Sequence, residues 1–251
     1  MHTRTNNTLL PFVAPIMDQR PTLLLTGATK GIGRAIADRF APHCARMALI
    51  ARTAADLQTV RQELQTIAPE CRIEVFPCDL ADAEAVQNLC QTLKAGYETV
   101  DILINNAGAY LPGTLLEEPN GTLEHMMAVN LYAPYHLSRA VWHQMPRGSH
   151  IFNIASVASR EGYIGKGSYG ITKAALLSFH HSMRYELKDK GIRTTAILPG
   201  PTWSDSWTGA DLPADRLLQA SEVAEAIWSA WQLPPNAVIE EITIRPQLGD
   251  L

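Results

Sequence analysis

The stretch TGATKGIG, residues 26–33, decides the fold of this chain. It directly follows the apolar run Leu23–Leu25, a pattern typical of a buried strand. The residues that come next, IGRAIADRFAP at 32–42, are typical of a helix. A helix N-terminus has unpaired backbone N–H groups and a partial positive charge, and it therefore binds anions. The stretch predicts a strand–turn–helix unit that can bind a phosphate group.

Each glycine of this turn has a separate expected role. We expect Gly27 to allow the tight turn and Gly31 to let the backbone approach a pyrophosphate. Gly33 would let the helix pack closely against the sheet. A glycine-rich turn alone is a weak indication of nucleotide binding, so the rest of the chain has to support it.

Apolar strand patterns and amphipathic helix patterns alternate along the remaining sequence. We expect further strands at 46–52, 72–80, 100–108, 150–156, 192–200 and 237–246. Helices are expected at 54–68, around 86–93, and at 121–145, 168–190 and 221–231. Because helices cross over between the strands, the sheet should be parallel and covered on both faces. The sequence predicts an α/β fold: a Rossmann-like, doubly wound sheet of about seven strands in a single domain, 21–251.

Several residues mark the expected helix ends. Thr53 and Asp56 form a capping-box pattern, Ser221 is a candidate N-cap, and Gly191 is a natural C-terminal cap.

Composition narrows the class of protein. The chain has 251 residues, 46% of them hydrophobic, and a net charge of -4 with acids and bases interspersed. This excludes the basic stripe of a nucleic-acid-binding protein, and no apolar run reaches the length of about 20 residues needed to span a membrane. The four cysteines have neither CxxC nor metal-ligand spacing, which predicts reduced core residues, no metal and a cytoplasmic location. Residues 1–20 are expected to be a disordered tail, and translation starts at either Met1 or Met17.

Two cations indicate which dinucleotide the turn would bind. Lys30 lies in the turn and Arg52 ends the second expected strand, where a site for NAD usually has an acid. Each alone is an ordinary surface charge. Together they would pair with the 2′-phosphate of NADP through charge-assisted hydrogen bonds.

The stretch NIASVASREGYIGKGSYGITK, residues 153–173, contains the candidate catalytic groups. Tyr169 and Lys173 are one helical turn apart and face the same side, and Ser156 lies at the end of the preceding strand. A phenol has a pKa of about 10, and a nearby ammonium would lower this pKa toward working pH. The serine hydroxyl would hold a carbonyl oxygen while charge develops on it. The three residues therefore predict proton transfer to or from a substrate oxygen.

With these motifs in order, the chain resembles the classical short-chain dehydrogenase/reductase family from about Thr22 to its last strand. The motifs are T-G-x-x-x-G-x-G at 26–33, Asp79-Leu80, N-N-A-G at 105–108, Asn130, Ser156, Y-x-x-x-K at 169–173, Pro199-Gly200 and Thr202. The resemblance implies that Tyr169 is the general acid and base, Lys173 binds the nicotinamide ribose, Ser156 orients the carbonyl, and Asn130 holds a water in a proton relay. It implies NADP(H) as cofactor, held by Gly27, Thr29, Lys30, Gly31, Ile32, Gly33, Arg52, Asp79, Leu80, Asn106, Ala107, Gly108, Tyr169, Lys173, Pro199, Gly200 and Thr202.

The expected activity is hydride transfer between NADP(H) and the carbonyl or alcohol of a small ketone or aldehyde. The alternative is a redox sensor that binds NADP without turnover. Candidate substrate contacts are Trp203 and Trp207, Tyr163 and Ile164, with Arg160 and Lys166 near the mouth. The C-terminal sequence VIEEITIRPQLGDL departs from the family pattern, in which the last strand often helps to build a tetramer. A homodimer through the helices at 121–145 and 168–190 and a homotetramer both remain open.

Overall fold

The computed structural model describes residues 20–163, 165–203, 213 and 216–250. The predicted tail, apart from Arg20, and Met17, Ile164 and Trp207 lie outside this part of the chain.

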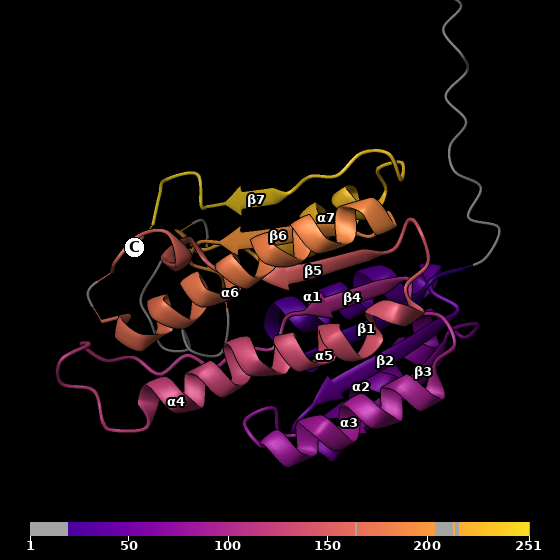
Figure 1. The fold of residues 1–251 in the computed structure, drawn as a ribbon, viewed down its shortest axis with the longest axis horizontal. Coiled ribbons are helices and arrows are strands. Elements are labelled where there is room, and N and C mark those ends of the chain that lie inside the picture. The colour runs from indigo at the N-terminus through magenta and orange to yellow at the C-terminus, as the bar shows by residue number, and fades with distance from the viewer. Residues whose placement is uncertain (1–19, 164, 204–212, 214–215, 251) are drawn as a thin grey trace, which may run out of the picture.

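One parallel sheet organises the molecule (Figure 1), and its strand order is β3-β2-β1-β4-β5-β6-β7. The strands are β1 (Thr22–Thr26), β2 (Arg46–Ala51), β3 (Arg72–Pro77), β4 (Ile102–Asn105), β5 (His150–Ile154), β6 (Arg193–Pro199) and β7 (Glu241–Ile244). This order is that of a doubly wound dinucleotide-binding sheet. The predicted Rossmann-like fold is therefore confirmed, whereas the prediction of a single domain over 21–251 stays a prediction.

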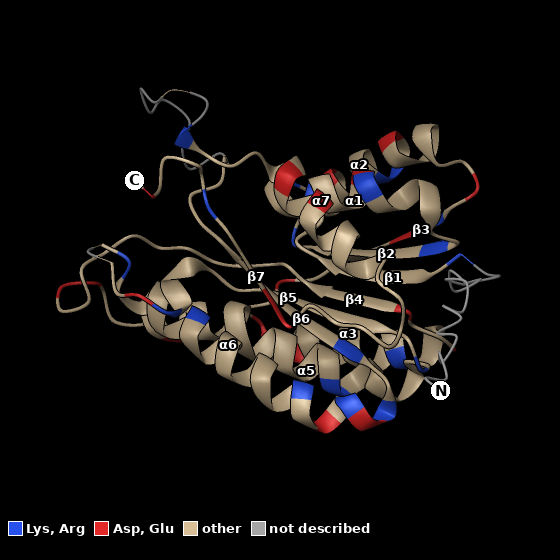
Figure 2. Cartoon of the chain, turned by 90° about the horizontal axis from the view of Figure 1, so that it is seen from above, with Lys and Arg blue, Asp and Glu red and all other residues tan. Residues whose placement is uncertain are grey.

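The helices cover the two faces of this sheet (Figure 2). α1 (Gly31–Phe40), α2 (Ala54–Ile67) and α7 (Ala220–Trp231) lie on one face; α3 (Ala83–Gly96), α5 (Ala133–Val141) and α6 (Gly167–Leu187) lie on the other. Leu23 and Leu25 pack into the core under α1, α2 and α7, and Leu24 packs into the opposite core. Because alternate residues of β1 point to opposite faces and both faces are covered, the strand is apolar throughout.

The long helical stretch expected at 121–145 is confirmed over residues 122–144, but it is not one regular α-helix. It consists of α4 (Thr122–Met127), a five-residue π-helical turn (Ala128–Tyr132), α5 and a 3₁₀ turn (Trp142–Gln144). Such π turns are frequent at functional sites. The Asn130 side chain within this turn bonds to Ala109 and Thr172, which lie in other elements.

Two predicted helix caps are wrong. The Thr53 side chain makes no capping hydrogen bond, although its carbonyl accepts from Leu57 N–H at 3.2 Å. α7 begins at Ala220 rather than after Ser221, and the Glu222 carboxylate accepts from the backbone N–H of Gln219 at 2.8 Å. Gly191 ends the 3₁₀ turn Lys188–Lys190 after α6 with φ +75°, which confirms the predicted cap.

Candidate active site

The crevice expected to bind a ligand lies where the strand order reverses, between β1 and β4. β1 pairs with β2 on one side and with β4 on the other, and all three strands are parallel. The turn after β1 and the Asn106–Gly108 segment after β4 therefore meet at the same edge. In open α/β sheets this topological switch point is where ligands bind.

The glycine turn needs its glycines for three different reasons. Gly27 has φ +69°, and a Cβ on it would lie 2.9 Å from Ala107 Cα. Gly31 has φ +52° and nothing within 4 Å of its Cβ position, so its backbone faces open space. A Cβ on Gly33 would lie 2.0 Å from the Gly27 carbonyl oxygen. The turn is therefore closed on its inner side and open where an anion could approach α1.

Thr26 joins this turn to the segment after β4. Its hydroxyl oxygen accepts from the backbone N–H groups of Asn106 and Ala107, both at 3.0 Å. The Asn106 amide donates back to the carbonyls of Thr26 at 2.9 Å and Gly27 at 3.1 Å. Thr26 was not among the predicted site residues, although its position at the start of the glycine motif was a usable signal. These bonds fix the two sides of the crevice relative to each other.

Ser156, Tyr169 and Lys173 converge beside this crevice, as their spacing predicted. Ser156 follows β5 and accepts from Ala158 N–H at 3.1 Å, and its side chain also hydrogen-bonds with that of Tyr169. Lys173 is 3% exposed, and its Nζ donates to the Ile154 carbonyl at 2.7 Å. Nζ lies 5.8 Å from the centre of the Tyr169 ring. The phenol, the hydroxyl and the ammonium thus share one site.

The electrostatics of this site differ from the prediction. Burial raises the pKa of Tyr169, the hydrogen bond with Ser156 partly opposes this, and Tyr110 raises the pKa further. Burial also lowers the pKa of Lys173 to about 8. The prediction that Lys173 lowers the phenol pKa is therefore wrong for this arrangement, because Nζ bonds to a carbonyl instead of the phenol and the site is desolvated. At neutral pH the phenol is protonated and most of the lysine is charged.

Asn130 is buried and joins the catalytic helix to the loop after β4. Its amide donates to the Ala109 carbonyl at 3.0 Å and to Thr172 Oγ1 at 2.8 Å, and its Oδ1 accepts from Ala109 N–H at 2.7 Å. A Cβ on Gly108 would lie 3.4 Å from both Asn130 Oδ1 and Lys173 Nζ. The Asn130 side chain therefore positions the loop and α6, and the predicted water relay stays a prediction.

The residues expected near the adenosine end of a dinucleotide follow β1, β2 and β3 at the same edge. Thr29, Lys30 and Ile32 belong to the glycine turn and the start of α1. Arg52 is exposed and makes no hydrogen bond or ion pair with any described residue. Asp79 is also exposed and accepts from Ala81 N–H at 3.0 Å, whereas Leu80 is 6% exposed.

The opposite end of the crevice is formed by the segment after β6. Pro199 ends that strand, and Gly200 donates to the Ile244 carbonyl at 2.8 Å. Thr202 Oγ1 donates to the Gly200 carbonyl at 3.0 Å. Trp203 is 45% exposed and follows directly. Thr202 and Trp203 therefore lie at the end of the sheet, where they could contact a ligand.

A groove of about 640 Å³ borders the Tyr169 helix, and residues 158–163, 165–167 and 114–115 form part of its lining. Both cations that were expected near the mouth of the site have partners within the protein. Arg160 forms an ion pair with Glu241 of β7, and Lys166 Nζ lies 4.5 Å from the centre of the Tyr163 ring. Tyr163 also lines the groove, and its contact with a substrate stays a prediction.

Comparison with known proteins decides the family. The family model described as short chain dehydrogenase matches residues 21–212. The chain belongs to the short-chain dehydrogenase family. This short-chain dehydrogenase is 32% identical over 240 residues to the sepiapterin reductase of Chlorobaculum tepidum, covering 91% of this chain and 97% of the relative.

Two solved structures are similar over the same length. One is a short-chain dehydrogenase from Burkholderia cenocepacia in complex with NADP, at 28% identity and a TM-score of 0.81, covering 91% of this chain and 97% of that chain. The other is a blue fluorescent protein from a metagenomic library in complex with NADPH, at 26% identity, a TM-score of 0.81 and the same coverage. This short-chain dehydrogenase is thus an oxidoreductase by family.

Three further observations bear on the predicted class. The described residues of this short-chain dehydrogenase contain no group of three or more His, Cys, Asp or Glu that could hold a metal ion. Within the same part of the chain, no helix has both the length and the apolar character to cross a bilayer. Cys44, Cys71, Cys78 and Cys90 are all unpaired, which agrees with the prediction of reduced cysteines.

Proposed function

We propose that this chain is an NADP(H)-dependent carbonyl reductase that acts on a small ketone or aldehyde, with Tyr169 as the proton donor. One observation carries the proposal: a hydrogen-bonded Tyr169–Ser156 pair lies beside buried Lys173, at the edge where the glycine turn opens. A reaction that moves a proton at a substrate oxygen uses all three groups together.

The residues of the crevice fit a dinucleotide. Gly31 has a left-handed backbone with open space at its Cβ position, and a side chain there would fill the place where a pyrophosphate meets the start of α1. Gly27 and Gly33 also lack room for a side chain. We assign the pyrophosphate to the glycine turn, the adenine side to Asp79 and Leu80, and the nicotinamide side to Asn106–Gly108, Lys173, Pro199, Gly200 and Thr202. When bound, the reduced nicotinamide supplies the hydride.

Side chains of this protein can supply the proton that the substrate oxygen receives. Tyr169 is protonated at neutral pH because burial raises its pKa, so it can donate its proton to the substrate oxygen. Ser156 hydrogen-bonds with Tyr169 and is placed to hold the same oxygen. Lys173 carries most of its positive charge at pH 7, and its Nζ would bind the nicotinamide ribose beside the phenol. Asn130 holds Ala109 and α6 in place and is a positioning residue.

The positive charges near the adenosine end favour NADP(H) over NAD(H). Arg52 is exposed at the end of β2 without a partner among the described residues, and Lys30 precedes α1. A cation at the end of β2 pairs with a 2′-phosphate, whereas an acid there would repel it. The NADP and NADPH complexes of the similar structures support this choice.

Turnover by the purified protein tests the proposal. NADPH consumption should be followed with benzaldehyde, cyclohexanone and phenanthrenequinone as trial substrates, and NADPH affinity should be measured separately. We expect oxidation of NADPH with at least one compound. Tight NADPH binding with no turnover on any carbonyl compound would contradict the reductase and favour the redox sensor.

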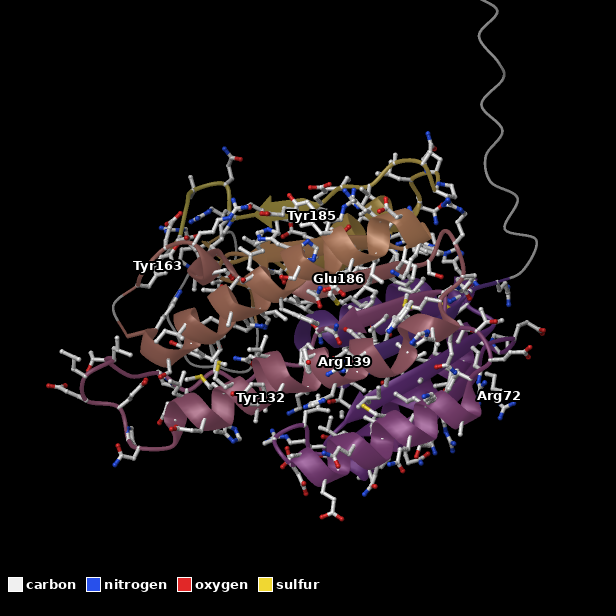
Figure 3. All side chains as sticks on the ribbon, viewed as in Figure 1. Arg72, Tyr132, Arg139, Tyr163, Tyr185 and Glu186 are labelled. Atoms are coloured by element: carbon white, nitrogen blue, oxygen red, sulfur yellow. The ribbon has the colours of Figure 1, made fainter. Side chains whose placement is uncertain are left out.

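Exposed aromatic residues on the π turn and on α6 support a homodimer. Figure 3 shows Tyr132 and Arg139 on the π turn and α5, and Tyr185 and Glu186 on α6, on the same side of the molecule. Tyr132 is 53% and Tyr185 72% exposed. Tyr185→Lys should shift a dimer toward monomer in sedimentation, whereas Leu248→Lys, at another exposed apolar residue, should not.

The location remains part of the proposal. We place the protein in the cytoplasm because all four cysteines are unpaired, as in a reducing compartment.

A further inference from the structure

The C-terminal residues turn back onto the candidate active site. After β7 the chain makes a turn in which Gly249, at φ +84°, donates its N–H to the Pro246 carbonyl at 2.9 Å. Glycine suits this left-handed position, and the turn brings Asp250 back beside Arg245. This is the part of the sequence that departs from the family pattern. We call residues 245–250 the C-terminal turn.

Charged groups join this turn to the segment after β5. Arg245 forms ion pairs with Asp250 and with Glu161, the latter at 3.0 Å. The Tyr163 hydroxyl lies 2.8 Å from Asp250 Oδ2, to which it donates, and accepts from Arg245 Nη1 at 3.3 Å. Figure 3 shows Tyr163 beside the place where the C-terminus is marked in Figure 1. Four side chains from two distant segments thus form one connected network.

The same turn also contacts the segment after β6. A Cβ on Gly200 would lie 2.9 Å from Asp250 Oδ1 and 3.3 Å from Pro246 Cδ. The Asp250 side chain is 12% exposed, and its Oδ1 has no hydrogen-bond partner among the described residues. The C-terminal turn therefore lies between Tyr163, which lines the groove, and Gly200, which precedes Thr202 by two residues.

The Tyr163 segment is attached to the rest of the molecule on its other side as well. Gly113 donates its N–H to the Gly165 carbonyl at 3.2 Å, and Ser168 Oγ donates to the Glu118 carboxylate. Residues 161–163 and 165–167 consequently form a wall of the groove that is held from both sides. A connected network of charge-assisted bonds holds such a wall better than isolated surface ion pairs, which contribute little.

We propose that the C-terminal turn is a clasp that positions Tyr163 and the Gly200–Thr202 segment around the bound carbonyl substrate, with Arg245 and Asp250 as positioning residues. This rests on the proposed reductase function. The bonds from Arg245 and Asp250 restrict the Tyr163 ring and the Gly200 backbone before substrate arrives. Removing them makes substrate binding bear the cost of ordering both segments, which raises KM and leaves the chemical step unchanged.

Three variants test the clasp: Asp250→Ala, Tyr163→Phe and the double variant. Asp250→Ala should speed amide hydrogen exchange over residues 161–167 by roughly tenfold, because a network that held them closed is lost. With whichever trial carbonyl the wild type reduces, both single variants should raise KM about fivefold with similar kcat, a loss of roughly 1 kcal/mol. The double variant should be no worse than either single variant, since both remove the same network.

Two controls separate positioning from general destabilisation. Glu240→Gln removes the Arg184–Glu240 ion pair at the start of the same C-terminal segment, away from the groove, and should leave KM and exchange over 161–167 unchanged. Affinity for 2′,5′-ADP, which represents only the adenosine side of NADPH, should be within about twofold of wild type in every variant, because the clasp does not contact the glycine turn.

The proposal is overturned if Asp250→Ala changes neither exchange over 161–167 nor KM, or if the two single effects simply add. It is also overturned if Glu240→Gln has the same effect as Asp250→Ala. Failure of the reductase function gives a different result: the wild type reduces none of the trial carbonyls, while hydrogen exchange still decides whether the C-terminal turn holds the Tyr163 segment.

Discussion

Replacing Lys173 with methionine should stabilise the protein and abolish its turnover. Lys173 is 3% exposed, and burial lowers its pKa from 10.5 to about 8. At pH 7 the folded protein therefore holds a charge that its interior disfavours. Methionine has a similar length, is uncharged and fills irregular apolar space. The residue that carries the catalytic charge is thus also a source of instability.

The magnitude follows from the pKa shift. One pKa unit corresponds to about 1.4 kcal/mol, so keeping Lys173 charged in the folded protein costs about 3 kcal/mol at pH 7. The variant loses the bond from Nζ to the Ile154 carbonyl, which contributes about 1 kcal/mol. The net gain in the free energy of unfolding is about 2 kcal/mol, or a rise in Tm of roughly 4–8 °C for a chain of this size.

The direction in which the stability of the wild type changes with pH provides a sharper test. Between pH 8 and 10.5 the unfolded chain holds the Lys173 proton and the folded protein does not, so the stability of the wild type rises with pH in this window. At pH 10 the remaining cost is about 1 kcal/mol, which the lost hydrogen bond cancels. The two proteins should then be equally stable.

Urea unfolding of both proteins without cofactor, at pH 7 and pH 10, measures this difference. Lys94→Met, which removes an exposed lysine of α3, is the matched control and should give no comparable gain at either pH. A Lys173→Met protein that is less stable than wild type at pH 7 would refute the reasoning. A stability difference that is the same at pH 7 and pH 10 would refute it as well.

Three other predictions concern the cofactor, the glycine turn and a buried histidine. Arg52→Asp should shift the ratio of kcat/KM from NADPH toward NADH by roughly 10- to 100-fold, and an unchanged ratio would exclude the phosphate role. Gly33→Ala should destabilise the protein by more than about 2 kcal/mol in urea unfolding, because its Cβ would lie 2.0 Å from the Gly27 carbonyl oxygen; Gly96→Ala, with nothing within 4 Å, should not. Burial lowers the pKa of His180 to about 4, so stability should fall by up to about 3 kcal/mol as pH drops from 6.5 to 4. His180→Leu should reduce that slope, and exposed His125→Gln should not.

The glycine turn and the alternation of strands and helices could be predicted because local patterns determine them. A continuous apolar run such as Leu23–Leu25 has to be buried on both faces, and Gly27 has to adopt the positive φ of the turn. The convergence of Ser156, Tyr169 and Lys173 also follows from local rules, namely strand ends at one edge and one helical turn of spacing.

The features that could not be predicted depend on partners distant in sequence. The π turn around Asn130 forms where its amide bonds to Ala109 and Thr172, and no local signal marks it. The ion pair between Arg160 and Glu241 joins two residues that are 81 positions apart in the chain.

The pKa values of buried groups also depend on residues distant in sequence and could not be predicted. The spacing of Tyr169 and Lys173 indicated that the ammonium would act on the phenol, but Nζ bonds to the Ile154 carbonyl instead. How far each group is removed from water depends on the packing of the whole site, and here burial is the largest cause of both shifts.

The most direct test of the account is a single-turnover measurement of NADPH oxidation by Tyr169→Phe. The substitution removes one hydroxyl and keeps the ring that packs edge-on against Tyr110, 5.1 Å between ring centres. The account predicts NADPH binding like that of wild type and a chemical step slowed by at least about 100-fold, the usual contribution of a positioned general acid. Oxidation of NADPH at the wild-type rate would contradict the assignment of Tyr169 as the proton donor.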